Sequence, residues 1–305
     1  MERTEYIWLD GQFVAWDEAR VHVLTHTLHY GLGVFEGIRC YEGTQGQAFV
    51  FRLSEHVERL FASAHILGIR IPFARAAIEA ACVETIRINR LRSGYIRPLV
   101  FLGDGEMGLA AVHNPVRVAI AAWPWGAYLG EEGLRNGVRL KTSSFQRMHV
   151  NTFMTKAKAV GNYVNSILAA IEARRAGFDE AMMLDTDGFV AECSGENLFV
   201  VRRGVVKTPP LTSVLEGITR ASVLTLLEGM RVRCVEERFT RDEAYIADEV
   251  FMTGTAAEVT PVREIDGRVI GDGSPGPITR ALQEQFHAIV KGEVAEYRHW
   301  LTPVP

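Results

Sequence analysis

The sequence predicts a two-domain protein of mixed α/β class, in which a small α+β domain precedes a larger, strand-rich domain. The chain has 305 residues, and domains typically contain roughly 100–200 residues, so the length suggests two hydrophobic cores. The one break in organisation is a stretch rich in glycine and aromatic residues. We therefore expect a first domain at residues 1–123, an interdomain loop at 124–136 and a second domain at 137–305. A cleft between two domains is the usual place for a ligand.

The first domain should combine a hairpin, extended segments and two helices. Asp10-Gly11 between two apolar runs predicts a hairpin over residues 6–16. Helical spacing of apolar residues follows at 54–67 and 73–89. Extended segments are expected at 34–41, 49–51, 95–102 and 116–123.

The second domain should consist mostly of strands, with helices packed outside. Turns are expected at Asp187-Gly188, Arg203-Gly204 and Asp266-Gly267, and a closing helix should begin at Pro277. A helix is also predicted after Gly161. On it Tyr163, Ile167, Leu168 and Ile171, together with Phe178, recur at helical spacing and should form the buried face.

Composition excludes several classes of protein. A formal net charge of -4 and the absence of a basic run argue against a nucleic-acid partner. The longest apolar stretch, residues 118–123, is far shorter than the ~20 residues that span a bilayer. The first residues have no signal-peptide pattern, and Cys40, Cys82, Cys193 and Cys234 are scattered without metal-site spacing. We expect a soluble, cytoplasmic protein with reduced thiols and no membrane partner.

Two sequence patterns resemble a nucleotide-binding motif and a metal site but are better explained otherwise. Residues 103–108 match the glycine-rich dinucleotide motif, but the short distance to Pro115 leaves no room for the helix that must follow. We read Met107 and Leu109 as apolar residues instead. His22, His26 and His29 have no cysteine or carboxylate close by in sequence, which favours hydrogen-bonded structural histidines over a metal site, so no metal is expected.

Candidate chemistry begins with two lysines, Lys156 and Lys158, just before the helix that follows Gly161. Cations are disfavoured at the N-terminus of a helix dipole, so a reactive amine competes with a solvated pair as the interpretation. Downstream, an acid-containing turn carries Glu192 and Glu196. The turns at 216–220 and 253–257 offer backbone N–H groups and hydroxyls to an anion, which Arg59 on the first predicted helix could also reach.

In order along the chain, these motifs resemble the fold-type IV pyridoxal-phosphate enzymes, most closely the bacterial branched-chain-amino-acid aminotransferases. The matching segments are residues 28–31, 34–39, 95–98, 124–130, 159 with 161–163, 195–199, 217–220 and 254–258. Each segment is weak evidence, whereas the ordered set covers nearly the whole chain. The resemblance implies the two-domain fold-type IV architecture, with domain 137–305 binding the cofactor in the interdomain cleft.

The resemblance also implies roles for individual residues. Lys158 would bind pyridoxal 5'-phosphate covalently and move a proton, Glu192 would pair with the ring nitrogen, and Tyr163 would bind the phenolic oxygen. Glu196 is the competing acid. The phosphate would be bound by Arg59, Ile218, Thr219 and Thr255. A lysine at position 156 departs from the family pattern, in which a small residue is usual. The spacing from Thr155 to Asn162 and Tyr163 fits Lys158.

The activity that the resemblance implies is transamination between leucine, isoleucine or valine and 2-oxoglutarate. The products would be branched-chain 2-oxo acids and glutamate, formed by a ping-pong mechanism. Side-chain selection would use Tyr30, Phe35, Leu109, Trp125 and Tyr163. Arg97, Tyr128 and Tyr30 would accept the second carboxylate of glutamate and 2-oxoglutarate, while Tyr95, Thr255 and Ala256 would hold the α-carboxylate. In relatives Tyr30 enters the neighbouring subunit's site, which implies a homo-oligomer, at least a dimer.

Three alternatives stay open at this point. The same scaffold carries D-amino-acid aminotransferases, which resemble an Arg-x-His pattern where this chain has Tyr95-x-Arg97. It also carries aminodeoxychorismate lyases, which fit the apolar box poorly. A non-catalytic cofactor carrier or an ordinary α/β ligand-binding protein is the alternative from a different class.

Overall fold

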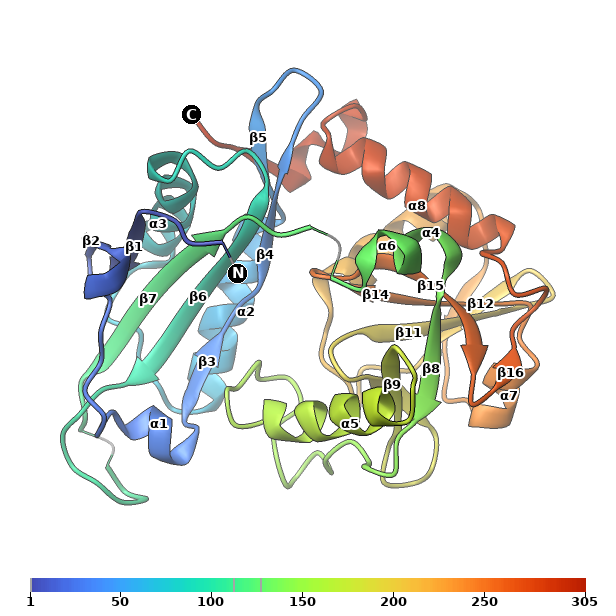
Figure 1. Cartoon of the computed structure of the whole chain (residues 1–305), viewed down its shortest axis with the longest axis horizontal. Coiled ribbons are helices and arrows are strands. Elements are labelled where there is room, and N and C mark those ends of the chain that lie inside the picture. Colours follow the sequence, from blue (N-terminus) through green and yellow to red (C-terminus); the bar gives the residue numbers. More distant parts are fainter. Residues whose placement is uncertain (1, 112, 127) are drawn as a thin grey trace. The chain divides into compact units, whose positions relative to one another are not determined.

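The computed structural model describes residues 2–111, 113–126 and 128–305. Ala127, in the predicted interdomain loop, lies outside the described residues. The chain divides into two compact units (Figure 1). Unit 1 comprises Met1–Gly126, Ala157–Gly161 and Ala288–Pro305, and unit 2 comprises Ala127–Lys156 and Asn162–His287. Residues 157–161 and 288–305, which we expected in the second domain, thus pack with the first.

Unit 1 is built on one sheet of eight strands within the described residues, in the order β17-β5-β4-β6-β7-β1-β2, with β3 paired to β6. Its strands are β1 (Tyr6–Leu9), β2 (Gln12–Ala15), β3 (Gly33–Phe35), β4 (Ile38–Glu42), β5 (Ala48–Phe51), β6 (Gly94–Leu102), β7 (Val116–Trp123) and β17 (Leu301–Pro303). Its helical elements are η1 (Trp16–Glu18), α1 (His26–Tyr30), α2 (Leu53–Ile66), α3 (Arg75–Ile88) and η2 (Ala295–Trp300).

The core of unit 1 lies between this sheet and the helices α2 and α3, which cover the same face (Figure 1). Val57 and Leu60 of α2 are buried at helical spacing, as expected for the helix predicted at 54–67, and Leu53, one residue before the predicted start, is buried as well. The predicted hairpin is confirmed, because β1 and β2 pair in antiparallel register around Asp10 and Gly11. Asp10 has a positive φ of 48° and Gly11 one of 99°, a backbone conformation that explains the Asp-Gly sequence.

The glycine-rich loop after β6 leads into no helix among the described residues. β6 ends at Leu102 and β7 begins at Val116, and the described residues between them form turns held by Asn114, whose side chain bonds to Glu106 and Gly103. His26 contacts the carbonyl of Gly108 at 2.8 Å through Nε2. The geometry agrees with the expected loop and with a structural role for His26.

Unit 2 contains a closed circuit of strands. Its described strands follow the order β10-β9-β8-β15-β14-β11-β12-β13, and β10 also pairs with β11, which returns the path to its start. The strands are β8 (Val138–Thr142), β9 (Glu180–Leu184), β10 (Val190–Cys193), β11 (Asn197–Arg202), β12 (Val205–Thr208), β13 (Cys234–Glu236), β14 (Glu249–Gly254), β15 (Glu258–Ile265) and β16 (Arg268–Val269). The helices are α4 (Gly130–Asn136), α5 (Tyr163–Arg175), α6 (Ile218–Gly229), α7 (Arg241–Tyr245) and α8 (Pro277–Val290), whose last residues belong to unit 1.

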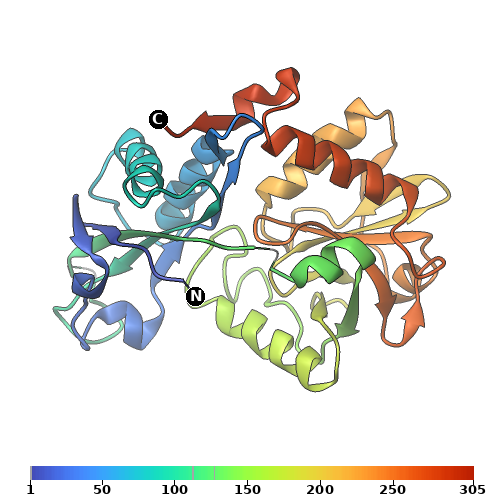
Figure 2. The same ribbon diagram turned by 45° about the horizontal axis from the view of Figure 1, so that its top comes forward.

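A strand-rich body with outer helices was expected here and is confirmed. The apolar core includes Leu140, Leu198 and Met252 from three strands of the circuit. Figure 2 shows α5, in yellow-green, running along the outside of these strands. No helix of the described residues is long and apolar enough to cross a membrane.

The buried face of α5 is not the one that the sequence predicted. Ile167, Leu168 and Ile171 are 54%, 43% and 41% exposed, whereas the buried residues are Ser166, Ala169 and Ala173. The small side chains pack beside Ala181 and Met183 of β9. A helix approaches a sheet closely where its facing side chains are small. Ile167, Leu168 and Ile171 therefore face outward, so the predicted orientation was wrong for them, whereas Phe178 packs against this small core.

Candidate active site

Lys158 is held at the edge of unit 1 by backbone pairing. The Phe35 N–H donates to the carbonyl of Lys158 at 3.1 Å, and the Val160 N–H donates to the carbonyl of Gly33 at 2.9 Å. Residues 157–161 thus lie beside β3 and pair with it in antiparallel orientation. The Nζ atom of Lys158 lies 5.0 Å from the centre of the Phe35 ring. This backbone pairing positions Lys158, the predicted reactive lysine, in unit 1.

Arg59 on α2 forms a two-pronged ion pair with Glu36, the residue after β3. Its Nε donates to Oε1 at 2.7 Å and its Nη2 to Oε2 at 2.9 Å. His56, one turn earlier on α2, contacts the same Oε2 through Nδ1 at 2.7 Å. Burial alone would raise the pKa of Glu36, but Arg59 and His56 hold it well below its usual range. Arg59 is therefore fixed by an ionised, fully buried acid.

Arg97 on β6 is surrounded by aromatic rings. Its guanidinium carbon lies 4.8 Å from the ring centre of Phe35, 5.2 Å from that of Tyr95 and 5.8 Å from that of Trp123. Nη2 donates to the Tyr95 hydroxyl at 3.3 Å, and the buried Nε has no hydrogen-bond partner. No acid of the described residues forms an ion pair with Arg97. A partly buried cation in this state favours a carboxylate ligand.

The aromatic wall extends to Trp125, whose ring packs edge-on to Tyr95 with centroids 4.4 Å apart. Gly37 allows the hydroxyl of Tyr95 to come close, since a Cβ at this position would lie 1.7 Å from it. The structure thus brings together Phe35, Tyr95, Arg97 and Trp125 in unit 1.

Two other predicted substrate residues of unit 1 do not join this aromatic group. Leu109 is 92% exposed, and Tyr30, at the end of α1, is 44% exposed. Within one chain, Leu109 is not part of an apolar wall.

Glu192 on β10 is the centre of a buried polar group in unit 2. Its Oε1 lies 2.6 Å from Nη2 of Arg147, and both side chains are more than 90% buried. Oε2 accepts from Asn197 Nδ2 and from the Leu215 N–H, each at 3.2 Å. The β10–β11 register places Asn197 directly opposite Glu192. An ion pair and two further donors favour the ionised carboxylate.

The competing acid, Glu196, is buried in the turn between β10 and β11. Its Oε2 accepts from the N–H of Gly195 at 3.2 Å, and the Glu196 carbonyl accepts from the Cys193 N–H at 2.7 Å. These two hydrogen bonds within the turn give Glu196 a structural role there. Glu192 is the acid that pairs with Arg147.

Lys156, the alternative amine, belongs to unit 2 and has different neighbours. Burial lowers the pKa of Lys156, against the opposing effect of Glu216, while Arg220 lowers it further. Lys158 instead lies beside Phe35 in unit 1.

The remaining predicted residues of unit 2 stand at the ends of its elements. Ile218 and Thr219 are buried and open α6, where Gly217 is the N-cap and no side chain caps the first turn. A Cβ at Gly217 would lie 2.0 Å from Oδ1 of Asn197, so this turn requires glycine. The N-terminus of α6, without a side-chain cap, is therefore suited to a phosphate.

Thr255 and Ala256 follow β14, Tyr163 is the first residue of α5, and Tyr128 lies just before α4.

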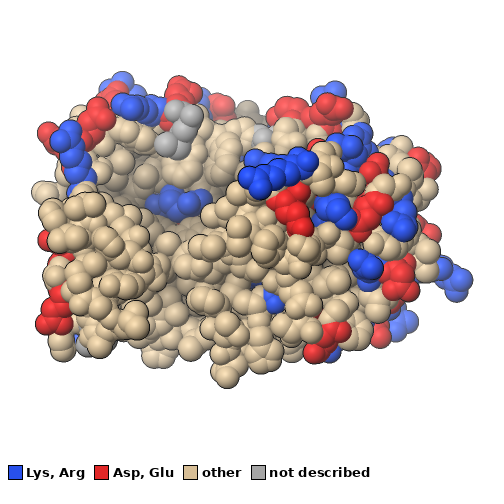
Figure 3. Space-filling model, turned by 60° about the horizontal axis from the view of Figure 1, so that its bottom comes forward, with Lys and Arg blue, Asp and Glu red and all other residues tan. Residues whose placement is uncertain are grey.

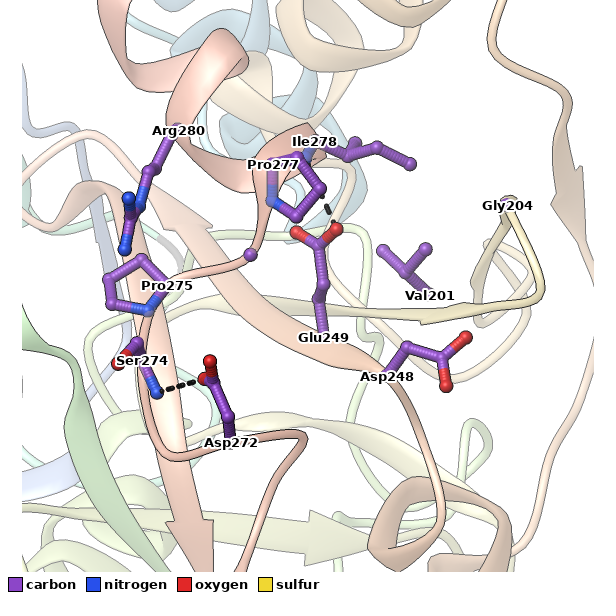
Figure 4. Close-up of a pocket in the computed structure, with 11 residues that line it drawn as sticks. Val201, Gly204, Asp248, Glu249, Asp272, Ser274, Pro275, Pro277, Ile278 and Arg280 are labelled. Atoms are coloured by element: carbon purple, nitrogen blue, oxygen red, sulfur yellow. Dashed lines mark hydrogen bonds between the residues drawn. The ribbon is translucent and has the colours of Figure 1, made fainter.

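A separate depression in unit 2, of about 700 Å³, has a structural explanation (Figure 4). It contains Glu249, whose carboxylate accepts from the N–H groups of Ile278 and Thr279 and from the Thr279 hydroxyl. Glu249 thereby satisfies the first N–H groups of α8. None of the predicted site residues lines this depression.

Sequence reasoning missed Arg147, Glu36 and His56. For His56 a signal existed, because it interrupts the apolar face of the helix predicted at 54–67. Arg147 gave none, since it lies in an irregular segment between β8 and α5.

Comparison with known proteins identifies the family. Residues 33–265 match the model of the amino-transferase class IV family. A branched-chain-amino-acid aminotransferase of Pseudomonas aeruginosa is 54% identical over 303 residues, covering 99% of this chain and 98% of the relative. The crystal structure of the T.th. branched-chain amino acid aminotransferase with pyridoxamine 5'-phosphate superposes with a TM-score of 0.97 at 50% identity, covering 100% of both chains.

Two further structures of the T.th. protein contain N-(5'-phosphopyridoxyl)-L-glutamate and 4-methylvaleric acid, each with a TM-score of 0.95 at 48% identity and full coverage of both chains. Similarity over the full length covers the segments that carry the buried acid, the lysine and the arginines described above. The chain therefore belongs to the class IV aminotransferases, within the group of the branched-chain-amino-acid aminotransferases.

Proposed function

We propose that this chain transfers amino groups between branched-chain L-amino acids and 2-oxoglutarate with pyridoxal 5'-phosphate as cofactor. The observation that carries the proposal is the environment of Arg97, a partly buried cation among aromatic rings with no acid partner in the described residues. Aromatic walls suit an aliphatic side chain, and the guanidinium suits the second carboxylate of glutamate. The two substrates of a ping-pong reaction can therefore share one pocket.

The residues present fit the cofactor. Arg59 together with the start of α6 (Ile218 and Thr219) and Thr255 would bind the phosphate. The carboxylate of Glu192, kept ionised by Arg147, would hold a proton on the ring nitrogen, and Tyr163 would donate to the phenolic oxygen. When bound, pyridoxal 5'-phosphate supplies a ring that withdraws electrons from the substrate Cα.

Lys158 would carry the proton. Its amine lies on the segment paired to β3, and we assign it both the covalent attachment of the cofactor and the movement of a proton from and to the substrate Cα. A lysine can act as a base only when its ammonium form has lost a proton. Lys156, with its neighbours in unit 2, has no assigned role.

For the substrate, we assign Phe35, Tyr95 and Trp125 to the apolar walls and Arg97 to the distal carboxylate. Tyr95 would also donate to the α-carboxylate, together with the backbone of Thr255 and Ala256. The remaining assigned residues are Tyr30, Leu109 and Tyr128, all exposed.

We further propose a homo-oligomer, at least a dimer. Exposed apolar side chains gather on α5, where Val164, Ile167, Leu168 and Ile171 are all more than 40% exposed. The surface over α5 in Figure 3 shows a broad area without Lys, Arg, Asp or Glu. Contiguous apolar area of this kind is typical of interfaces. A second copy would also give Leu109 and Tyr30 apolar surroundings.

The four cysteines are free thiols, and three are buried. Burial raises the pKa of Cys40 to about 12, which leaves this thiol unreactive. Free thiols are typical of a reducing compartment, and we propose the cytoplasm as the location.

An amino-donor panel tests the activity. Purified protein with pyridoxal 5'-phosphate should form glutamate from 2-oxoglutarate with leucine, isoleucine and valine, and should be inactive with D-alanine. Borohydride reduction followed by peptide mapping should place the pyridoxyl group on Lys158. Bound cofactor without transfer would indicate a carrier, activity with D-amino acids would indicate the alternative enzyme, and a label on Lys156 would transfer the role of the amine to that residue.

A further inference from the structure

One face of α2 holds both the candidate phosphate ligand and the segment that carries Lys158. His56, Arg59 and Ser63 are spaced three and four residues apart, so their side chains project from the same side of the helix. His56 and Arg59 both bond to Glu36. Ser63 Oγ accepts from the N–H of Lys158 at 3.0 Å. A single helix, α2, thus positions both Arg59 and the segment that contains Lys158.

The group is almost fully withdrawn from water. The side chains of Glu36, His56 and Arg59 are 0%, 1% and 13% exposed. Burial lowers the pKa of His56, against the opposing effect of Glu36, and the positive charges of Arg59 and Lys158 lower it further. We take His56 as neutral at neutral pH, with Nδ1–H donating to Oε2 of Glu36. The negative charge of Glu36 is then balanced by the positive charge of Arg59.

This geometry restricts Arg59. A free arginine side chain can adopt many rotamers, and it loses this conformational entropy when it binds a ligand. The two bonds to Glu36 hold the guanidinium plane before any ligand is present, and a preorganised group binds its ligand more tightly. His56 in turn holds the carboxylate, together with the Gly37 N–H, which donates to the same oxygen at 3.2 Å. The Glu36 backbone is anchored by its N–H, which donates to the carbonyl of Pro98 at 2.9 Å.

We propose that Glu36 and His56 are positioning residues, which orient Arg59 toward the phosphate of the cofactor and thereby set how tightly the cofactor is retained. The inference rests on the proposed function, since it assumes that Arg59 binds the phosphate. Neither residue touches the substrate or the reacting atoms in this assignment. Both act through Arg59.

The test compares two ligands that differ only in the phosphate. The full-length protein, freed of cofactor, is titrated with pyridoxal 5'-phosphate and with pyridoxal, and binding is followed by absorbance. Removing a hydrogen bond to a charged group corresponds to roughly a tenfold to hundredfold change in affinity. His56→Leu should lose about this factor for pyridoxal 5'-phosphate and keep its affinity for pyridoxal. The matched control is His65→Leu, an exposed histidine on the same helix, which should change neither.

A conservative replacement separates positioning from general damage. In His56→Asn the amide nitrogen stands near the place of Nδ1, so affinity for pyridoxal 5'-phosphate should be largely restored. In His56→Gln the amide lies farther out and should not restore it. If His56→Leu does not fold, the comparison of the Asn and Gln variants decides the question.

The outcomes are distinct. Equal loss of affinity for both ligands, or equal affinity of the Asn and Gln variants for pyridoxal 5'-phosphate, would overturn the positioning role. If the unaltered protein binds no pyridoxal 5'-phosphate, the proposed function itself fails. Unaltered protein that binds the cofactor, with His56→Leu binding it equally well, contradicts only the inference about His56.

Discussion

The guanidinium of Arg147 lies 2.6 Å from the carboxylate of Glu192, and both side chains are buried in unit 2. Arg147 also reaches the hydroxyl of Ser166 on α5 at 3.4 Å. The pair therefore links an irregular segment, a strand of the closed circuit and the helix outside it. We expect this link to support both the fold of unit 2 and the charge of Glu192.

Arg147→Met should destabilise the protein strongly. It removes the guanidinium that balances the charge of the buried Glu192, and breaking a buried pair in this way typically costs about 3–5 kcal/mol in the free energy of unfolding. Denaturant unfolding of the cofactor-loaded protein measures the change. Arg3→Met is the control, because the Arg3–Asp17 pair is exposed and such pairs contribute up to about 1 kcal/mol. Similar losses in the two variants would contradict the assigned importance of the buried pair.

Replacing Glu192 should separate binding from turnover. In Glu192→Gln the proton on the ring nitrogen loses its stabilising charge, so turnover should fall by orders of magnitude, each factor of ten being ~1.4 kcal/mol of transition-state stabilisation. Cofactor affinity should remain close to normal, because the phosphate ligands are intact. Steady-state kinetics and absorbance titration measure both. Glu196→Gln serves as the comparison. If Glu196→Gln is the inactive variant and Glu192→Gln is active, the two roles are reversed.

Arg97→Met should affect the two half-reactions unequally. Glutamate and 2-oxoglutarate lose a charged partner worth ~1.5–3 kcal/mol, which corresponds to roughly a tenfold to hundredfold loss. Leucine should react nearly as before, because its side chain needs only the apolar walls. Single-turnover absorbance changes, recorded separately with leucine and glutamate, report each half-reaction. Equal losses would mean that Arg97 binds the α-carboxylate or only supports the pocket.

A charge on the outer face of α5 should disrupt the oligomer. Ile167 is 54% exposed, and Ile167→Glu would place an acid in the proposed interface, where burial of an unpaired charge is unfavourable. Light scattering after size-exclusion chromatography should show a smaller species. The control, Val269→Glu, changes another exposed apolar residue of unit 2, on β16, and should leave the mass unchanged. An unchanged mass in Ile167→Glu would place the interface elsewhere.

Asp266 should contribute to acid stability. Burial raises its pKa, but hydrogen bonds from Thr142, Lys141 and Tyr245 outweigh this effect and hold the pKa at about 2. A carboxyl whose pKa is lowered by folding stabilises the protein above its unfolded pKa, about 4, and this stability disappears as the pH falls toward 2. In acid titrations of stability, Asp266→Asn should show a weaker dependence on pH between about 4 and 2 than the unaltered protein. Parallel curves would show that Asp266 has no such role.

The local elements and the order of the motifs could be predicted from the amino-acid sequence alone. The Asp10-Gly11 hairpin and the buried face of α2 follow from backbone preference and apolar spacing, which act between near neighbours in the chain. The order of the motifs also placed the chain in its family before any contact was known. Lys158, Glu192 and Arg97 could be proposed as site residues in this way because each lies in a motif of its own.

The contacts of each helix face and of each charged side chain depend on how the whole chain folds. Apolar spacing showed that α5 has a large apolar face, but the approach to β9 required small side chains, so Ile167 and Ile171 face outward. Sheet register set Asn197 opposite Glu192, and chain packing brought Arg147 to the same carboxylate. Residues far apart in the chain meet through the summed packing of the elements between them. No local pattern contains that information.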